Sequence, residues 1–221
     1  MNGVKSTSLP DSSAVGSSIE RWIALDLETT GLSPTRHEIR ELAAVPFGIA
    51  EGAEHVLRFT RADFQVSSRA VARPRLAELL PMLGEGSVLV AHNAAFDLAF
   101  LAEALRRARL GPFVLRAYCT LRLARIVFPD LPRHDLVFLR EALRLNTGKP
   151  HVALADARAV AALFAVLVQR AGFLDEQALR ALHGPPLRVG ASSAHSRIVA
   201  HRGPDGIILS WSGNATESGA G

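Results

Sequence analysis

The sequence of 221 residues is short of several features, and each shortage excludes a class of protein. It contains one cysteine, Cys119, so an intrachain disulfide is excluded. The longest apolar run, near residues 159–168, is too short to span a bilayer, so no membrane-spanning helix is expected. The polar N-terminal stretch does not read as a secretory signal peptide. Together these absences favour a cytoplasmic protein with no membrane partner.

Lysine is also scarce, because Lys5 and Lys149 are the only two in the chain. The net charge is +4, and almost all of the positively charged residues are arginines. A basic protein is attracted to polyanions such as nucleic acid, but these arginines are spread along the chain rather than gathered in blocks. Such a bias can equally reflect genome base composition, so the charge permits a nucleic-acid partner without identifying one.

The length suits one domain with appendages. Residues 1–18 are rich in serine and poor in core-forming side chains, which predicts a disordered leader. Residues 19–183 carry the strand and helix patterns and are predicted to form the folded domain. Residues 184–221 are predicted to be a C-terminal tail, in which residues 197–211 form either an ordered hairpin or a loose chain.

The order of the predicted elements indicates an α/β fold. A strand begins at Trp22, two more are expected over residues 42–49 and 55–59, and strands then alternate with helices. Pro46 predicts that the second strand lies at a sheet edge or contains a bulge. A long helix near residues 153–171 is apolar on most sides and is expected to be central to the core. This order is typical of a mixed sheet with helices packed on its faces.

Two acids interrupt the first strand, and they are the most informative residues in the sequence. Asp26 and Glu28 are two positions apart, so their side chains emerge on the same face. Two ionised carboxylates beside an apolar core cost several kcal/mol unless a partner compensates them. A hard divalent cation such as Mg²⁺ fits that demand, whereas a solvated strand end is the bland alternative.

Two further acids and one histidine have positions that favour the same site. Asp97 begins a helix that follows a buried strand, although a first-turn acid also interacts favourably with a helix dipole. Asp156 shares a helix face with Val160 and is predicted to point into the core. His151 lies five residues earlier, in the preceding loop, where a histidine could accept a proton from a water molecule.

Three stretches of the chain resemble the exonuclease motifs of the DnaQ-like DEDDh family of 3′-5′ exonucleases. They are residues 25–32, 92–97 and 151–156, and residues 119–125 resemble the family's helix between the second and third motifs. The family includes the epsilon subunit of DNA polymerase III and exonuclease X. The resemblance covers about residues 20–172, and all five functional positions are filled as the family requires.

The resemblance implies a ribonuclease H-like fold, with a five-stranded mixed sheet flanked by helices. It also implies that Asp26, Glu28, Asp97 and Asp156 hold two divalent cations, Mg²⁺ or Mn²⁺, and that His151 is the general base. Thr29, Leu32, Asn93 and Phe96 correspond to positions that contact the substrate strand. Packing remains the alternative for Leu32 and Phe96, and helix capping for Asn93.

Three functions are therefore weighed. The first is hydrolysis of DNA from its 3′ end, on single strands or frayed ends, in repair or proofreading with a polymerase or repair partner. The second keeps the chemistry but takes RNA ends or short oligoribonucleotides, because the contacts that distinguish the 2′-hydroxyl are not motif residues. The third is a catalytically silent module that binds nucleic acid or a polymerase. All five positions are intact, which favours an enzyme.

Overall fold

We describe the fold from a computed structural model. The structure describes residues 21–47, 55–58, 69–83, 86–110, 113–145, 147–172, 176–184, 187–191, 197–203 and 206–212. The leader predicted over residues 1–18 lies outside these ranges. Within the same ranges, no helix combines the length and the apolar character that crossing a membrane requires.

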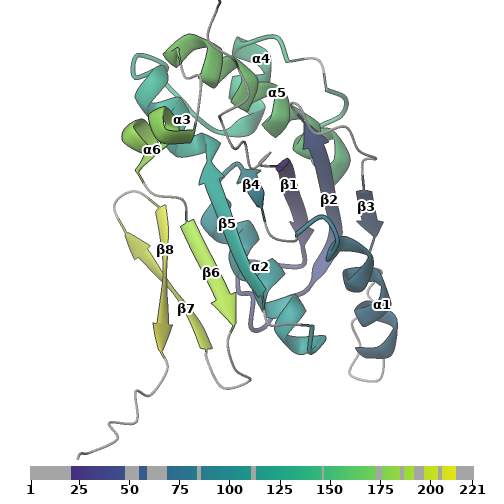
Figure 1. Ribbon diagram of the computed structural model, residues 1–221. Coiled ribbons are helices and arrows are strands. Elements are labelled where there is room, and N and C mark those ends of the chain that lie inside the picture. Colours follow the sequence, from purple (N-terminus) through teal and green to yellow (C-terminus); the bar gives the residue numbers. More distant parts are fainter. Residues whose placement is uncertain are drawn as a thin grey trace, which may run out of the picture.

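The centre of the fold is a mixed sheet with the strand order β3-β2-β1-β4-β5-β6 (Figure 1). Its strands are β1 (Arg21–Thr29), β2 (Ile39–Phe47), β3 (His55–Arg58), β4 (Ser87–Ala91), β5 (Phe113–Cys119) and β6 (Leu187–Ala191). β4 is parallel to both β1 and β5, whereas the β1-β2, β2-β3 and β5-β6 pairs are antiparallel. β1 and β4 are therefore the central strands, with a neighbour on each side.

The predicted α/β class is confirmed, but the sheet has one strand more than the five expected. The additional strand, β6, comes from the segment that the sequence assigned to the tail, and it pairs antiparallel with β5. A five-residue edge strand carries too little alternation to be told from a loop by its sequence. Its pairing with β5 defines it instead.

Of the two alternatives predicted from Pro46, an edge strand is wrong, whereas β2 does contain an irregularity: its register with β1 shifts between Glu28 and Thr29, away from Pro46. β2 is not an edge strand, because it lies between β1 and β3. β3 pairs only with residues 41–44 of β2, whereas Pro46 lies opposite Ile23 of β1. Pro46 therefore lies beyond the part of β2 that pairs with β3, and its missing N–H costs no bond to that strand.

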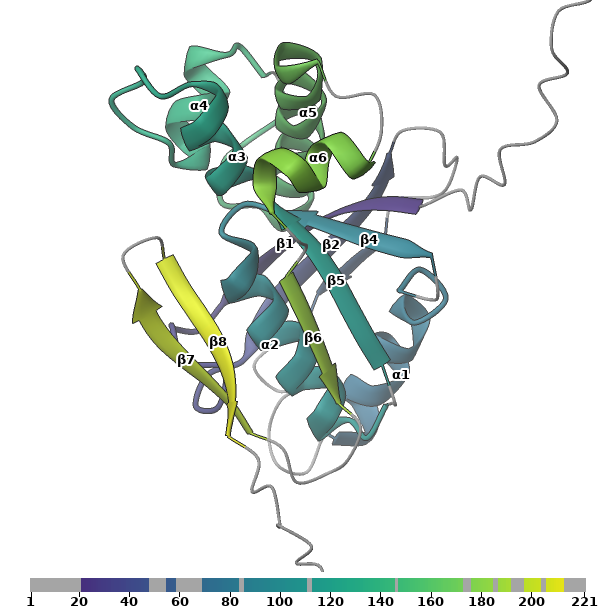
Figure 2. The ribbon, with the colours of Figure 1, turned by 60° about the vertical axis from the view of Figure 1, so that its left-hand side comes forward.

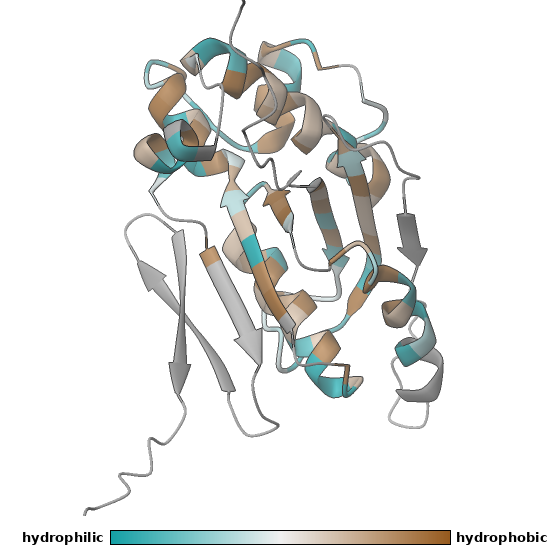
Figure 3. Ribbon diagram, viewed as in Figure 1, coloured by the Kyte–Doolittle hydropathy of each residue, from teal (hydrophilic) through white to brown (hydrophobic). Residues whose placement is uncertain are grey.

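Helices cover both faces of the sheet (Figures 1 and 2). They are α1 (Arg69–Leu79), α2 (Ala94–Arg107), α3 (Thr120–Val127), α4 (Leu136–Ala142), α5 (Ala153–Ala171) and α6 (Glu176–His183). α1 and α2 contribute to one hydrophobic core, and α3, α4, α5 and α6 contribute to the other. β4 lies between the two cores and is hydrophobic along its length (Figure 3). The predicted central helix is confirmed as α5, which buries Val160, Leu163 and Leu167.

A second, two-stranded sheet follows β6. β7 (Arg197–Gly203) and β8 (Gly206–Ser212) pair antiparallel from end to end. Both strands lie beside α2 (Figures 1 and 2). Of the two alternatives left open for residues 197–211, the backbone adopts the hairpin.

Candidate active site

The alternation of side chains along β1 places the two acids of that strand. Ile23 and Leu25 belong to the core beneath α1 and α2, whereas Ala24 belongs to the core beneath α5. Asp26 and Glu28 lie two and four positions after Ala24, so their side chains point to the same face of the sheet as that of Ala24. Both carboxylates therefore emerge on the face of the sheet that α5 covers, at the end of a strand whose earlier residues are buried.

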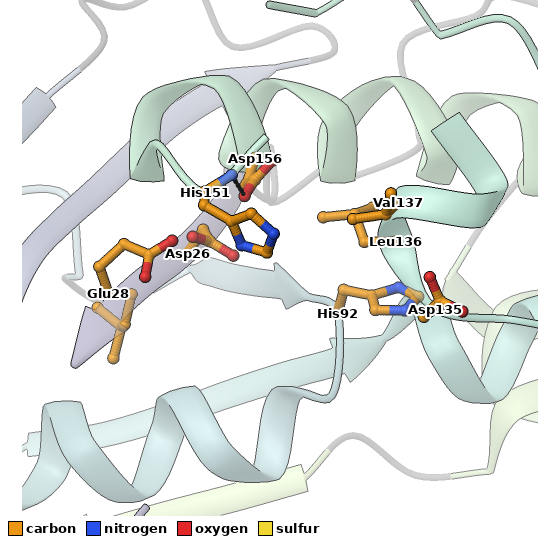
Figure 4. Close-up of a pocket in the computed structure, with 9 residues that line it drawn as sticks. Asp26, Glu28, His92, Asp135, Leu136, Val137, His151 and Asp156 are labelled. Atoms are coloured by element: carbon orange, nitrogen blue, oxygen red, sulfur yellow. Dashed lines mark hydrogen bonds between the residues drawn. The ribbon is translucent and has the colours of Figure 1, made fainter. Parts of the chain in front are cut away.

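A cavity of about 270 Å³ lies at this end of β1. Its lining residues come from β1, β4, the start of α4 and the segment entering α5, and they are Asp26, Leu27, Glu28, His92, Asp135, Leu136, Val137, His151 and Asp156. Figure 4 shows the carboxylates of Asp26 and Glu28 beside the ring of His151. The cavity thus brings together four of the five predicted catalytic residues. Asp97 is the fifth and does not line it.

Asp26 is in an environment that disfavours its ionised form. Burial raises the pKa of its carboxyl group well above the ordinary value, and the charges of Asp97, Asp156 and Glu28 raise it further. Burial also raises the pKa of Glu28, although the nearby His151 opposes that shift. A cluster of buried carboxylates without enough positive charge is the electrostatic condition that a bound cation relieves.

Asp97 lies in the first turn of α2 and is only 4% exposed. Burial raises the pKa of its carboxyl group to about 8, although hydrogen bonds from the backbone of Asp97 and Leu27 lower it. Its charge is among the causes that raise the pKa of Asp26. Asp97 is therefore close enough to Asp26 for its charge to act on that carboxyl group, although it does not line the cavity.

Asp156 and His151 are joined by a hydrogen bond. His151 precedes α5, as predicted, and its backbone N–H donates to Oδ2 of Asp156 over 2.9 Å. The other oxygen, Oδ1, accepts a hydrogen bond from Nη1 of Arg140, a buried residue of α4. The Asp156 carboxylate is therefore held by two groups on different elements, while the His151 side chain stays exposed at the cavity.

The donor atoms around the cavity fit a divalent cation. Glu28, His151 and Asp156 each offer one ligand atom, and the three atoms lie within 4.8 Å of one another. Carboxylate oxygens are the ligands that Mg²⁺ and Mn²⁺ prefer, and imidazole suits Mn²⁺ better than Mg²⁺. Burial, and after it the charges of neighbouring acids, raises the pKa of Asp26, so a cation in the cavity would favour its ionised form. The residues present therefore suit a hard divalent ion.

The predicted substrate residues Thr29 and Leu32 lie at the end of β1 and in the loop after it. Thr29 Oγ1 donates to the carbonyl of Gly31 over 2.8 Å, which fixes the start of the loop. Gly31 has no room for a side chain, because an added Cβ would lie 2.5 Å from the ring of His37. Leu32 is 83% exposed, so core packing, the alternative considered for this residue, does not explain it.

The other two predicted substrate residues, Asn93 and Phe96, are at the start of α2. Asn93 occupies the N-cap position with a left-handed φ of 69°, but its side chain makes no capping hydrogen bond. The capping interpretation of Asn93 is therefore wrong in its mechanism. The Phe96 ring contacts that of Phe100 in a tilted arrangement, with 4.8 Å between ring centroids, and packs on the core while remaining half-buried. Packing accounts for part of the Phe96 ring and leaves the rest accessible.

An ion-pair cluster ties the Leu32 loop to α2. Glu103 is buried and receives hydrogen bonds from Arg106 and Arg107. Arg107 also donates to the carbonyl oxygens of Pro34 and Thr35, at 3.0 and 2.7 Å. Burial opposes the ionisation of Glu103, but the two arginines hold the pKa of its carboxyl group below the ordinary value. The loop that presents Leu32 is thereby fixed to a rigid helix.

Glu103→Ala is expected to lower the free energy of unfolding by about 2 kcal/mol, because it leaves two partly buried arginines without their shared acceptor. For a chain of this length the melting temperature should fall by about 5 °C. Glu78→Gln, a change at an exposed acid of α1, is the matched control and should leave the melting temperature unchanged. Equal thermal denaturation curves for wild type and Glu103→Ala would contradict the role of the cluster.

Sequence reasoning missed several residues of the cavity. Among them His92 hydrogen-bonds Thr120, with 3.0 Å between Nδ1 and Oγ1, while its buried Nε2 has no partner in the structure. Burial lowers the pKa of His92 to about 4, so its ring is neutral. His92 precedes Asn93 in the second motif, and that adjacency was an available signal. Arg140 gave none, since an arginine on a short helix is ordinarily exposed.

Comparisons with known proteins agree with this fold. The sequence model of the RNase_T family, described as an exonuclease, matches residues 58–164. DNA polymerase III PolC-type from Staphylococcus aureus is 30% identical over 163 residues, which are 67% of this chain and 11% of that protein. The chain thus spans about a tenth of the length of the curated relatives it matches.

Solved structures share the fold at lower identity. Escherichia coli exonuclease I in complex with a dT13 oligonucleotide matches with a TM-score of 0.57 and 16% identity, over 73% of this chain and 46% of that one. A complex of the same enzyme with a dA16 oligonucleotide gives a TM-score of 0.56 at 16% identity, over 74% and 45% of the two chains. The fold is therefore the ribonuclease H-like α/β fold, and the described residues Glu28, His151 and Asp156 form an acidic centre on it. The match to the exonuclease family model and the similarity to the PolC-type polymerase support the DnaQ-like DEDD exonuclease family that the three motifs predicted.

Proposed function

We propose that this protein is a metal-dependent 3′-5′ exonuclease that releases nucleoside monophosphates from the 3′ ends of DNA. One observation carries the proposal. Asp26, Glu28, Asp156 and His151, which come from a central strand and from the start of a helix packed on it, face a single cavity. A carboxylate cluster beside an exposed histidine is what hydrolysis of a phosphodiester requires, namely a cation site and a group that takes a proton from water.

The four acids would hold two divalent cations, with Asp97 contributing directly or through water. When bound, such cations supply positive charge beside the scissile phosphate and make water more acidic. An imidazole nitrogen of His151 takes one proton from the attacking water. The water oxygen bonds to phosphorus, the bond from phosphorus to the 3′ oxygen of the preceding nucleotide breaks, and that 3′ oxygen takes up a proton from solvent. The products are a nucleoside 5′-monophosphate and a strand shorter by one nucleotide with a new 3′-hydroxyl.

DNA is proposed as the substrate because the relatives reported above are DNA polymerases by name. The same relatives support a DNA polymerase as a partner, so that the reaction would serve proofreading or repair. Thr29 and Leu32, at the end of β1 and in the loop after it, and Asn93 and Phe96, at the start of α2, are proposed to hold the terminal nucleotides. Contacts of an apolar or aromatic side chain with a base tolerate any sequence, as an exonuclease needs.

A panel of labelled oligonucleotides tests the proposal. Single- and double-stranded DNA and RNA, labelled at either end, are incubated with the protein and Mg²⁺ or Mn²⁺. We expect 5′-labelled single-stranded DNA to shorten one nucleotide at a time, while a 3′ label is released at once as a mononucleotide. Faster hydrolysis of RNA would replace DNA by RNA as the substrate. Absence of hydrolysis on every substrate would favour a catalytically silent binding module.

Leu32→Ser is expected to raise the KM for single-stranded DNA about fivefold with little change in kcat. The exposed leucine contributes apolar contact with a base, and losing about 1 kcal/mol of that contact weakens binding by this factor. Val114→Ser is the matched control, because Val114 is 65% exposed on β5 and does not line the cavity. An unchanged KM in Leu32→Ser would remove Leu32 from the substrate site.

A further inference from the structure

Arg140 is an unusual residue, because its charged side chain is buried next to the acidic centre. The side chain is 7% exposed, whereas arginines of short helices normally extend into solvent. One guanidinium nitrogen, Nη1, donates to Oδ1 of Asp156, and the other, Nη2, donates to the carbonyl of Gly148. Arg140 therefore binds a predicted cation ligand and the backbone of the histidine-bearing loop with one planar group.

The loop in question, residues 147–152, is conformationally demanding. Gly148 has a φ of 101° and His151 a φ of 60°, and the left-handed region is unfavourable for a residue with a side chain such as histidine. Two hydrogen bonds join side chains of the site to the backbone of this loop within the described residues. They are the Arg140 bond to Gly148 and the bond from His151 N–H to Oδ2 of Asp156. Both hydrogen bonds depend on the placement of Arg140 and Asp156.

We infer that Arg140 is a positioning residue that clamps the Asp156 carboxylate and the His151 loop into one arrangement. The inference rests on the proposed function for its catalytic consequence, but not for its geometry. Each oxygen of Asp156 accepts one hydrogen bond, Oδ1 from Arg140 and Oδ2 from the His151 backbone, and keeps a further lone pair for a cation. Arg140 thus fixes the orientation of Asp156 without occupying all of its acceptor sites.

The planar fork of arginine is needed for this arrangement. Two nitrogens at a fixed separation reach two acceptors at once, whereas a lysine ammonium is a single point charge on a flexible stem. A purely structural ion pair would be satisfied by lysine, since the charge opposite Asp156 would remain. Arg140→Lys therefore keeps the positive charge but removes the two-point hydrogen bonding, so it distinguishes a clamp from simple charge compensation.

The experiment compares Arg140→Lys with wild type and with Arg144→Lys, a control at an exposed residue just after the same helix. Amide exchange of the metal-free protein is followed by NMR, and Mn²⁺ binding by calorimetry. We expect the His151 amide to exchange at least tenfold faster in Arg140→Lys and Mn²⁺ to bind about 10- to 100-fold more weakly. The melting temperature and the amides of β4 should match wild type.

The kinetic expectation for Arg140→Lys is a kcat reduced about 10- to 100-fold with a KM within about twofold of wild type. Amide exchange and Mn²⁺ binding equal to wild type would overturn the clamp. If wild type hydrolyses nothing, the proposed function fails, while amide exchange and Mn²⁺ binding still decide the clamp. Should Arg140→Lys not fold, Arg140→Gln keeps a hydrogen-bond donor without a buried charge and is held to the same exchange and binding criteria.

Discussion

Asp26→Asn is expected to lower the rate of nucleotide release by about a thousandfold or more while raising the melting temperature of the metal-free protein. Asparagine keeps the shape of the side chain but removes a charge that a cation needs. In the metal-free protein that charge is unfavourable, because burial and neighbouring acids raise the pKa of Asp26. Relief of about 1 kcal/mol of repulsion corresponds to a rise of about 3 °C.

The opposite signs of these two effects make the Asp26 variant informative. A variant that merely misfolds would lose both activity and stability. Asp130→Asn is the matched control, because Asp130 is an exposed acid that does not line the cavity. Its activity and melting temperature should equal those of wild type. Retention of more than about a tenth of wild-type activity by Asp26→Asn would contradict the proposed chemistry.

The metal-free protein is expected to lose about 2 kcal/mol of stability as the pH rises from about 6.5 to about 8. Burial raises the pKa of Asp97 from 3.8 to about 8, so in this window the folded chain binds a proton that the unfolded chain has released. The stability that Asp97 contributes is fully present below about pH 4 and is lost as the pH rises through its folded pKa. Asp26 is shifted in the same direction.

Two histidines limit where this effect can be observed. Burial lowers the pKa of His92 and of His183 to about 4, so their contribution to stability is present above about pH 6.5 and is lost as the pH falls toward 4. Below pH 6.5 the histidines therefore oppose the carboxyl groups. Between about pH 6.5 and 8, Asp97 and Asp26 change the free energy of unfolding, whereas His92 and His183 do not.

Urea unfolding at several pH values, with and without Mg²⁺, measures the effect. Cations favour ionised carboxylates, so saturating Mg²⁺ should flatten the decline above pH 6.5. Asp97→Asn removes the titrating group and should flatten it without metal. A free energy of unfolding that rises between pH 6.5 and 8 would contradict the burial of a protonated Asp97. An unaltered slope in Asp97→Asn would assign the effect to another group.

The sequence predicts the site best where side-chain direction follows from local periodicity. Two-residue alternation along β1 is enough to place Asp26 and Glu28 on one face, and helical spacing from Val160 is enough to turn Asp156 inward. A histidine five residues before Asp156 had to lie outside the helix, and α5 indeed begins at Ala153. These placements need only the geometry of one strand or one helix.

Features that depend on tertiary packing were beyond such reasoning. Arg140 is buried because α4 packs beside α5, which no pattern in the seven residues of α4 indicates. Asp97 was expected to join the acids directly or through water, and the sequence could not show that α2 buries its carboxyl group away from the lining of the cavity. β6 is a strand because β5 offers it an edge. In each case the deciding contact is made with a residue distant in the sequence.

Titration of the metal-free protein with Mn²⁺, followed by calorimetry, tests the central claim most directly. That claim is that the carboxylates of β1, α2 and α5 form one divalent-cation site. Wild type is predicted to bind two Mn²⁺ ions per chain, and Asp26→Asn is predicted to lose at least one of them while Asp130→Asn keeps both. Absence of saturable Mn²⁺ binding by wild type, or identical binding by Asp26→Asn, would contradict the account.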